Sequence, residues 1–174
     1  MTAKAKVLIP REEIGRQVAR LAAEINRDYQ GRDIFVVGVL KGCFVFVADL
    51  VRLLDVPVEI DFVALSSYGR GTESSGQVTV THGLISGVAG KDVLVVEDIV
   101  DTGTTTDFFL GYLRTQGPSS LALCTLLDKP ARRKVPVSID YLGFTIPDVF
   151  VVGYGLDCDQ QLRQLPDICV LEEP

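Results

Sequence analysis

The sequence predicts a doubly wound α/β fold, in which helices flank a mainly parallel sheet. Short apolar runs alternate along the chain with amphipathic runs of helical spacing, as strands and helices alternate in such folds. Several apolar runs have no polar position, which indicates strands covered on both faces. The chain has 174 residues and shows no internal repeat or linker, so residues 1–174 are predicted to form a single domain.

The first half of the chain alternates helix and strand patterns. Residues 11–29 have helical spacing, and Gly31 and Asp33 then break the pattern. The apolar face of this predicted helix consists of Ile14, Val18, Leu21, Ala22 and Ile25. Residues 34–40 are apolar throughout and predict a central parallel strand. Residues 44–54 return to a helical pattern, and residues 58–65 are strand-like.

The second half begins with a segment of loop composition, residues 66–76, followed by a short β-branched run at 78–81. Residues 93–96 predict another buried strand. A helix should follow and continue to about residue 116, because Gly117 and Pro118 stop it. Further strands are predicted at residues 121–127, near 139–142, at 149–154 and near 168–171.

Charge and composition exclude several classes of function. The formal net charge is -6, and the densest basic run, residues 129–134, is short and interrupted by Pro130. Binding to long nucleic acids requires clustered cations, so no nucleic-acid partner is expected. The longest apolar runs, 34–40 and 43–48, are far below the roughly 20 residues of a membrane span. With no apolar segment after the first residues to suggest a secretory signal, we expect a cytoplasmic protein without a membrane partner.

One motif carries most of the chemistry. The buried run V-L-V-V is followed by the adjacent acids Glu97 and Asp98, then by Asp101, and the segment T-G-T-T-T then opens a helix. Gly103 permits a turn in which successive N–H groups converge, so this helix start predicts an anion site. The hydroxyl groups of the turn add donors, and they belong to Thr102, Thr104, Thr105 and Thr106.

Three acids beside an anion site imply a ligand of mixed character. Adjacent carboxylates suit a cis-diol and can also support Mg²⁺, so the expected ligand carries a phosphate close to a diol, as ribose 5-phosphate does. A P-loop is excluded because no G-x-x-x-x-G-K-[ST] is present. The alternative is purely structural: Asp101 and Thr102 would cap the helix, and Glu97 and Asp98 would form a solvated turn.

The motif V-L-V-V-E-D-I-V-D-T-G-T-T resembles the phosphoribosyl pyrophosphate motif of type I phosphoribosyltransferases. Four further segments resemble the bacterial hypoxanthine-guanine phosphoribosyltransferases. They are L-K-G at residues 40–42, S-S-Y-G at 66–69, L-L-D-K-P at 126–130 and G-F-x-I-P-D-x-F-V-V-G-Y-G-L-D at 143–157. The resemblance extends from about residue 9 to residue 171.

The resemblance implies a reaction, a cofactor and an architecture. The phosphoribosyl group passes from 5-phosphoribosyl 1-pyrophosphate to hypoxanthine or guanine with Mg²⁺, which releases pyrophosphate. The implied type I fold adds a small hood, made from the N-terminal segment and about residues 140–174, and a mobile lid loop at about 66–77. The family commonly forms homodimers or homotetramers.

The resemblance also implies a role for each matching residue. Asp101 is the general acid/base near the purine N7. The phosphoribosyl group would contact Glu97, Asp98, Thr102, Gly103, Thr104, Thr105 and Thr106. Pyrophosphate would contact Lys41, Gly42 and Arg163, with a cis peptide bond between Leu40 and Lys41.

The purine would contact a separate set of residues. Lys129 would donate to its 6-oxo group, Phe150 would stack on its ring, and Val151 and Asp157 would lie at its edge. Ser67 and Tyr68 match the lid. The ligands of Mg²⁺ would be Glu97, Asp98 and Asp157.

Other functions remain open at this stage. The same reaction with another base is one alternative, and xanthine is the closest competitor. A non-catalytic regulator that binds nucleic acid on the same fold is another, although such a protein should have a basic face and this chain is acidic.

Overall fold

The computed structural model describes residues 5–67 and 78–171. Its helices are α1 (Arg11–Asp28), α2 (Phe44–Val51), α3 (Thr104–Arg114) and the short 3-10 helix η1 (Pro130–Arg132). Its strands are β1 (Ala5–Ile9), β2 (Ile34–Leu40), β3 (Val58–Ser67), β4 (Val78–His82), β5 (Asp92–Val100), β6 (Ser120–Asp128), β7 (Tyr141–Thr145), β8 (Val151–Val152) and β9 (Ile168–Leu171).

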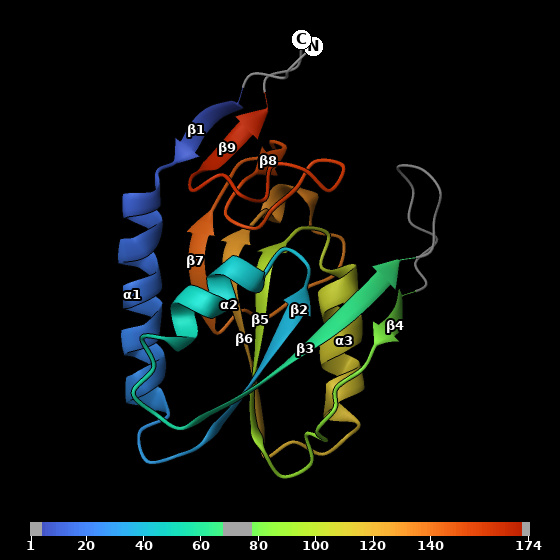
Figure 1. Cartoon of the computed structure of the whole chain (residues 1–174). Helices are drawn as coiled ribbons and strands as arrows, with labels where there is room; N and C mark the ends of the chain where they lie inside the picture. Colours follow the sequence, from blue (N-terminus) through green and yellow to red (C-terminus); the bar gives the residue numbers. More distant parts are fainter. Residues whose placement is uncertain (1–4, 68–77, 172–174) are drawn as a thin grey trace.

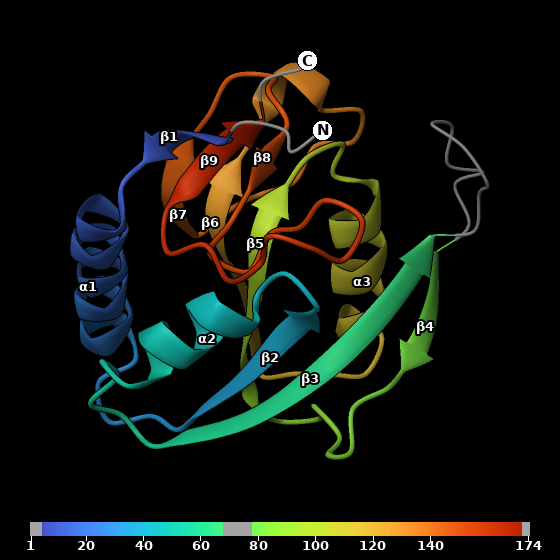
Figure 2. The same cartoon turned by 45° about the horizontal axis from the view of Figure 1, so that its top comes forward.

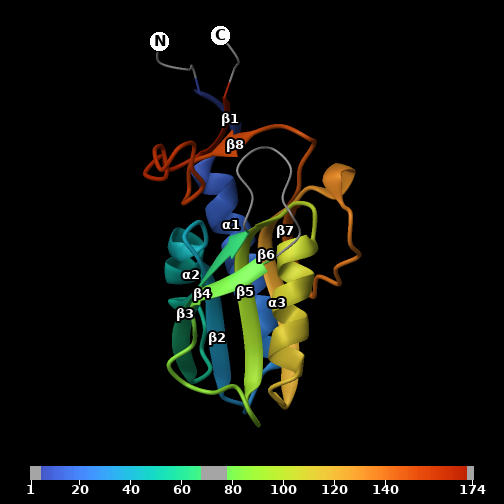
Figure 3. The ribbon, with the colours of Figure 1, turned by 90° about the vertical axis from the view of Figure 1, so that its right-hand side faces the viewer.

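Six strands form the main sheet in the order β4-β3-β2-β5-β6-β7. All neighbours pair in parallel except β4, which runs antiparallel to β3. Helices α1 and α2 cover one face and α3 covers the other, as the view along the sheet in Figure 3 shows. The predicted doubly wound, mainly parallel α/β fold is therefore confirmed.

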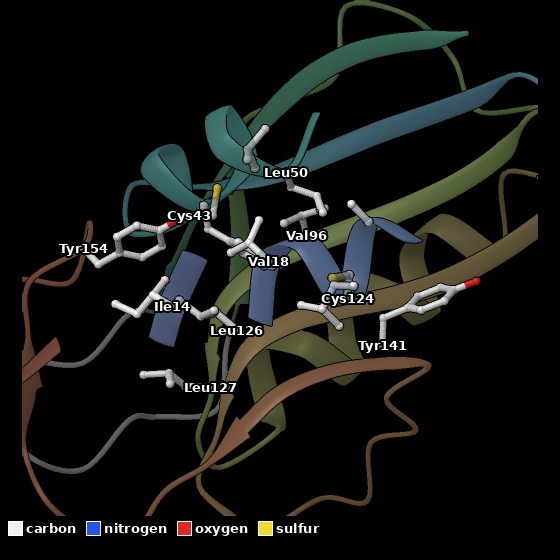
Figure 4. Close-up of a cluster of buried hydrophobic side chains, with 14 of the residues drawn as sticks. Ile14, Val18, Cys43, Leu50, Val96, Cys124, Leu126, Leu127, Tyr141 and Tyr154 are labelled. Atoms are coloured by element: carbon white, nitrogen blue, oxygen red, sulfur yellow. The ribbon is translucent and has the colours of Figure 1, made fainter. Parts of the chain in front are cut away.

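The larger core lies between α1, α2 and the sheet. The apolar face predicted for α1 is buried, and Phe46 and Leu50 of α2 are fully buried beside it. Figure 4 shows Ile14 and Val18 of α1 facing Val96 of β5 and Leu126 of β6. Within the described part of the chain, no helix combines the length and apolarity that a membrane span requires.

A second, three-stranded sheet, β1-β9-β8, lies beyond the carboxyl ends of the parallel strands (Figures 1 and 2). It joins the beginning of the chain to its end, since Lys6 pairs with Val170 and Val7 with Cys169. Of the segments expected to form the hood, β1, β8 and β9 lie in this sheet, whereas β7, within residues 140–174, pairs with β6 in the main sheet. The strand predicted at 149–154 is reduced to β8 and joins the second sheet.

Several elements differ in length from their predicted bounds, and the differences in α2 and β3 have local causes. Helix α2 ends at Val51 rather than at residue 54, because the amides of Leu53 and Leu54 bond three residues back and tighten the last turn. Strand β3 continues through Ser67, since pairing with β4 extends it by two residues. Most of the predicted lid, about residues 66–77, lies outside the described residues, and so does Tyr68. Only the backbone of residues 66–67, at the end of β3, is described.

Candidate active site

The sequence predicts that the acidic pair of the motif follows a buried strand. In the structure, the pair lies inside that strand. Strand β5 continues to Val100, so Glu97 and Asp98 point to opposite faces of the sheet. Glu97 faces α3 and accepts a hydrogen bond on Oε2 from Thr106 Oγ1 at 2.8 Å. Asp98 faces the loop after β2, where a Cβ built on Gly42 would lie 1.5 Å from Asp98 Oδ2. Gly42 is therefore required for the close packing of this loop on the carboxylate.

Burial changes the acidity of both carboxyl groups. It raises the pKa of Glu97 to about 8; the hydrogen bond from Thr106 opposes this effect and the charge of Asp98 adds to it. Burial likewise raises the pKa of Asp98 to about 6, against backbone hydrogen bonds that favour the charged form. Glu97 Oε1 and Asp101 Oδ1 are buried and have no hydrogen-bond partner among the described residues. Such atoms call for a ligand, since an unpaired buried acceptor is costly.

These shifts predict how stability depends on pH. Because the folded-state pKa of Glu97 is about 8 and the ordinary value is 4.5, the folded state holds more protons than the unfolded state between these limits. The contribution is complete below about pH 4.5 and is lost as the pH rises through about 8. We expect the free energy of unfolding of the ligand-free protein to fall between about pH 6 and pH 8.5.

Denaturant titrations at both pH values test this expectation. Glu97→Gln, which cannot ionise, should show a clearly smaller fall than the wild-type protein. Equal falls in the two proteins would assign the pH dependence to other groups.

The turn after the acids has the geometry of an anion site. Gly103 precedes α3 with φ of 83°, and a Cβ at this position would lie 2.5 Å from the carbonyl oxygen of Val135. The first N–H that bonds within the helix is that of Asp107, to the Gly103 carbonyl at 2.9 Å, so the preceding amides have no helical partner. The N-cap residue is Gly103, which has no side chain, and Thr102 Oγ1 accepts the Thr104 N–H in a long contact of 3.4 Å. Of the structural alternative, the solvated Glu97-Asp98 turn is wrong, because both acids lie inside β5, and no hydrogen bond joins the Asp101 side chain to this helix start among the described residues.

A cavity of about 250 Å³ brings the two halves of the motif together. It is lined by residues from β2, β3, β5 and the start of α3. Of the predicted site residues, it contains Lys41, Gly42, Glu97, Asp98, Asp101, Thr102, Gly103, Thr105 and Thr106. Thr104 lies outside it, where its amide and hydroxyl are both 3.4 Å from Thr102 Oγ1.

Asp101 lines this cavity and directly follows the last residue of β5. Its Oδ2 lies 3.4 Å from Arg132 Nη1 in a half-exposed ion pair, while Oδ1 has no partner. Arg133, for which the sequence predicted no role, holds the backbone here. Its Nε donates to the Asp101 carbonyl at 3.0 Å, and its Nη2 donates to Val100 at 3.2 Å and to the Asp128 carboxylate. In the sequence, Arg133 is noticeable only as a member of the basic run 129–134, for which no partner was predicted.

Lys129 is the buried cation of the site, with 5% of its surface exposed. Its Nζ donates to the Val149 carbonyl at 2.8 Å, and Asp148 Oδ1 lies 3.8 Å away. The neighbouring Phe150 is 56% exposed, whereas Val151 is buried in β8. These residues lie together, outside the 250 Å³ cavity. An exposed Phe beside a buried Lys leaves an aromatic face for a planar ligand.

On the other side of the cavity, two loops interlock. The peptide bond between Leu40 and Lys41 is cis, as expected from the resemblance. Gly155, with φ of 100°, packs so closely that a Cβ there would lie 2.1 Å from the Gly42 carbonyl oxygen. The loop of residues 153–165 therefore rests directly on the Lys41-Gly42 loop.

Gln160 joins the cations of these two loops and was not foreseen. Its Oε1 accepts hydrogen bonds from Lys41 Nζ at 3.0 Å and from Arg163 Nη2 at 3.2 Å. Arg163 also pairs with Asp157 Oδ1 at 2.8 Å and donates to the Gly155 carbonyl at 2.8 Å. Gln160 has a φ of 64°, in the left-handed region. A glutamine in the sequence does not indicate that its backbone adopts this conformation.

The donor set fits Mg²⁺ only as a site shared with a ligand. Among the described residues, no three His, Cys, Asp or Glu side chains are grouped to hold a metal ion. Asp157, a predicted Mg²⁺ ligand, pairs through Oδ1 with Arg163 at 2.8 Å. Its Oδ2 accepts a hydrogen bond from the backbone N–H of Gln160 at 2.8 Å. The unpaired Glu97 Oε1 remains available, and Asp98 lines the same cavity. Mg²⁺ is commonly bound by one or two carboxylates together with substrate phosphates, and these residues suit that mode.

An acid-bearing central strand, a Thr/Gly turn that opens a helix and a small second sheet beyond the strand ends together match the type I phosphoribosyltransferase fold. The family model described as the phosphoribosyl transferase domain matches residues 9–159. The hypoxanthine-guanine phosphoribosyltransferase of Bacillus subtilis is 45% identical over 167 residues, which cover 96% of this chain and 93% of that protein. A crystal structure of a Bacillus anthracis hypoxanthine-guanine phosphoribosyltransferase superposes with a TM-score of 0.93 at 46% identity, covering 98% and 99% of the two chains.

The chain therefore belongs to the phosphoribosyltransferase family, and within it to the hypoxanthine-guanine group. It is also 46% identical to part of the bifunctional protein TilS/HprT of Listeria monocytogenes. The match covers 96% of this chain, but the chain spans only 26% of that longer protein.

Proposed function

We propose that this protein is a purine salvage enzyme that transfers the 5-phosphoribosyl group from 5-phosphoribosyl 1-pyrophosphate to hypoxanthine or guanine. The products are IMP or GMP and pyrophosphate. One observation carries the proposal: residues with unpaired, buried acid oxygens line the same cavity as the start of a helix, where the N–H groups of Thr105 and Thr106 have no partner among the described residues. A ligand that satisfies both must combine hydroxyl groups with a phosphate, as this donor does.

The donor would bind across the motif. The amides of the Gly103 turn and of the first turn of α3, with the hydroxyls of Thr102, Thr104 and Thr105, would hold the 5-phosphate. Glu97 and Asp98 would accept from the ribose hydroxyls. When bound, Mg²⁺ supplies positive charge that stabilises the leaving pyrophosphate. Glu97 and Asp98, which line the cavity, would hold it together with ligand oxygens, and Asp157 would join them on releasing Arg163 or the Gln160 backbone N–H.

The leaving group would lie between the interlocked loops. Lys41 and Arg163, which share Gln160, would contact pyrophosphate, and the close packing at Gly42 would let the backbone approach it. Ser67 and Tyr68 would close over the site and exclude water, which otherwise competes with the base.

The acceptor base would bind near the hood. Asp101 would exchange a proton with the purine N7, and its unpaired Oδ1 supports that role. Phe150 would stack on the ring, with Val151 and Asp157 along its edge. Lys129 would donate to the 6-oxo group, which favours hypoxanthine and guanine over adenine, whose 6-amino group is a donor.

Lys129→Met tests the assignment of the base. The change removes the cation and keeps an unbranched side chain, so the KM for hypoxanthine should rise about 10- to 100-fold, the range for a lost hydrogen bond to a charged group. The KM for the phosphoribosyl donor should change less than about threefold. Steady-state kinetics with hypoxanthine, guanine, xanthine and adenine measure both quantities and rank the bases.

Lys134→Met is the matched control, because Lys134 is an exposed cation in the same basic run. An unchanged KM for hypoxanthine in Lys129→Met would remove Lys129 from the base site. A wild-type preference for xanthine would replace the proposed acceptor and keep the donor.

We further propose that the protein acts in the cytoplasm as a homodimer or homotetramer, without a nucleic-acid or membrane partner. The acidic net charge of -6 supports the absence of a nucleic-acid role and argues against the regulator. Sedimentation or light scattering measures the oligomeric state.

A further inference from the structure

Thr106 and Glu97 form a buried pair beneath the candidate donor site. Thr106 is 3% exposed and Glu97 is 5% exposed. The Thr106 hydroxyl donates to Glu97 Oε2 at 2.8 Å, whereas Oε1 of the same carboxylate has no partner among the described residues. Both residues line the 250 Å³ cavity. The pair therefore fixes one carboxylate oxygen and leaves the other for a ligand.

The surroundings of α3 explain why the hydroxyl points to the acid. A threonine in a helix commonly bonds back to the carbonyl four residues earlier, which here is that of Thr102. That carbonyl already accepts the amides of Lys134 at 2.8 Å and of Val135 at 3.1 Å. The Thr106 hydroxyl instead reaches across to β5.

The same residue also belongs to the anion site. The first helical hydrogen bond begins at Asp107, so the Thr106 N–H has no partner within the helix. The N–H of Thr106 thus lies at the helix start that is proposed to bind phosphate. Its hydroxyl holds Glu97, which is proposed to bind the ribose diol. In this arrangement a single residue connects the two halves of donor recognition.

We propose that Thr106 is a positioning residue: its hydroxyl orients Glu97 so that Oε1 accepts a ribose hydroxyl, while the N–H of the same residue contributes to 5-phosphate binding. This inference rests on the proposed function, because it takes a ribose 5-phosphate group as the ligand. It replaces the expectation that the Thr106 hydroxyl itself donates to the phosphate. A ligand without ring hydroxyls should not depend on the Thr106 side chain.

Two small ligands separate these roles. Ribose 5-phosphate carries both the phosphate and the diol, and tetrahydrofurfuryl phosphate keeps the ring and phosphate without any hydroxyl group on the ring. Their dissociation constants are measured by calorimetry without Mg²⁺ on the wild-type protein and on Thr106→Val, an isosteric change that removes the donor. We expect about 5- to 20-fold weaker binding of ribose 5-phosphate to Thr106→Val and a change within about twofold for tetrahydrofurfuryl phosphate.

Two further variants keep the test decisive. Thr106→Ser retains the hydroxyl and should bind ribose 5-phosphate within about threefold of wild type, even if Thr106→Val folds poorly. In a Glu97→Gln background, Thr106→Val should add less than about a twofold loss, because the residues act as one unit.

Equal weakening of both ligands in Thr106→Val would overturn the inference, since the hydroxyl would then serve the phosphate or the fold. Unchanged binding of both would overturn it as well. A wild-type protein that binds the two ligands equally would reject the proposed ribose site itself, and the inference with it. If wild type prefers ribose 5-phosphate and Thr106→Val keeps that preference, only the role of Thr106 fails.

Discussion

Replacing Asp101 with asparagine will lower kcat/KM for the purine base by about 10²- to 10⁴-fold, the usual contribution of a positioned acid or base. The amide keeps the shape of the side chain but cannot accept and return a proton. Because Oδ1 is buried and unpaired in the described structure, no other group satisfies it before the base arrives. Steady-state kinetics in both directions measure the loss.

The matched control is Asp107→Asn, six residues further along the same motif. Asp107 is an exposed acid in the first turn of α3 and does not line the cavity. It should stay within about threefold of wild type, with at most about 1 kcal/mol lost from its interaction with the helix dipole. If Asp101→Asn also stays within about threefold, a change below ~1 kcal/mol, Asp101 is not the acid/base.

Gly155→Ala will both destabilise the protein and weaken binding at the loops proposed to hold pyrophosphate. Its backbone has φ of 100°, and the new Cβ would lie 2.1 Å from the Gly42 carbonyl oxygen, so the interlocked loops must separate. Strain and overpacking each cost about 1–3 kcal/mol, so we expect a loss of about 2–6 kcal/mol in the free energy of unfolding. For a chain of this size, that lowers Tm by roughly 4–20 °C.

Gly111→Ala provides the matched control for this substitution. Gly111 lies within α3, and a Cβ there meets nothing within 4 Å, so alanine should stabilise the helix by about 0.5–1 kcal/mol. Thermal unfolding and pyrophosphate binding are measured on both variants. If Gly155→Ala unfolds like wild type and binds pyrophosphate normally, the loops do not depend on their close contact.

Much of the fold was predictable, because side-chain spacing records which face of an element is buried. Strand β2 has the bounds that its apolar run predicts, and α1 buries the predicted face. Strand β5 is the instructive exception. Its local pattern stops at the acids, yet the strand continues through them because Thr106 and Gly42 accommodate their side chains from other elements.

The part of the site proposed to bind the donor could be predicted from the sequence for a related reason. Its acids, its glycine turn and its helix start are contiguous, so their geometry follows from local backbone rules. Gln160 and Arg133 could not be found in this way. Gln160 acts on Lys41 across 119 positions, and Arg133 acts on the Asp101 carbonyl across 32. No local pattern marks such partners.

The sequence by itself determined the class of fold, the donor motif and the chemistry that its acids and amides can supply. Only the tertiary structure decided how the site is assembled: which carboxylate oxygen is fixed by Thr106, which cations share Gln160, and how β1 pairs with β9. The physical reason is that periodicity and turn chemistry act between near neighbours. Burial and hydrogen bonding between distant residues depend on how the folded loops come together.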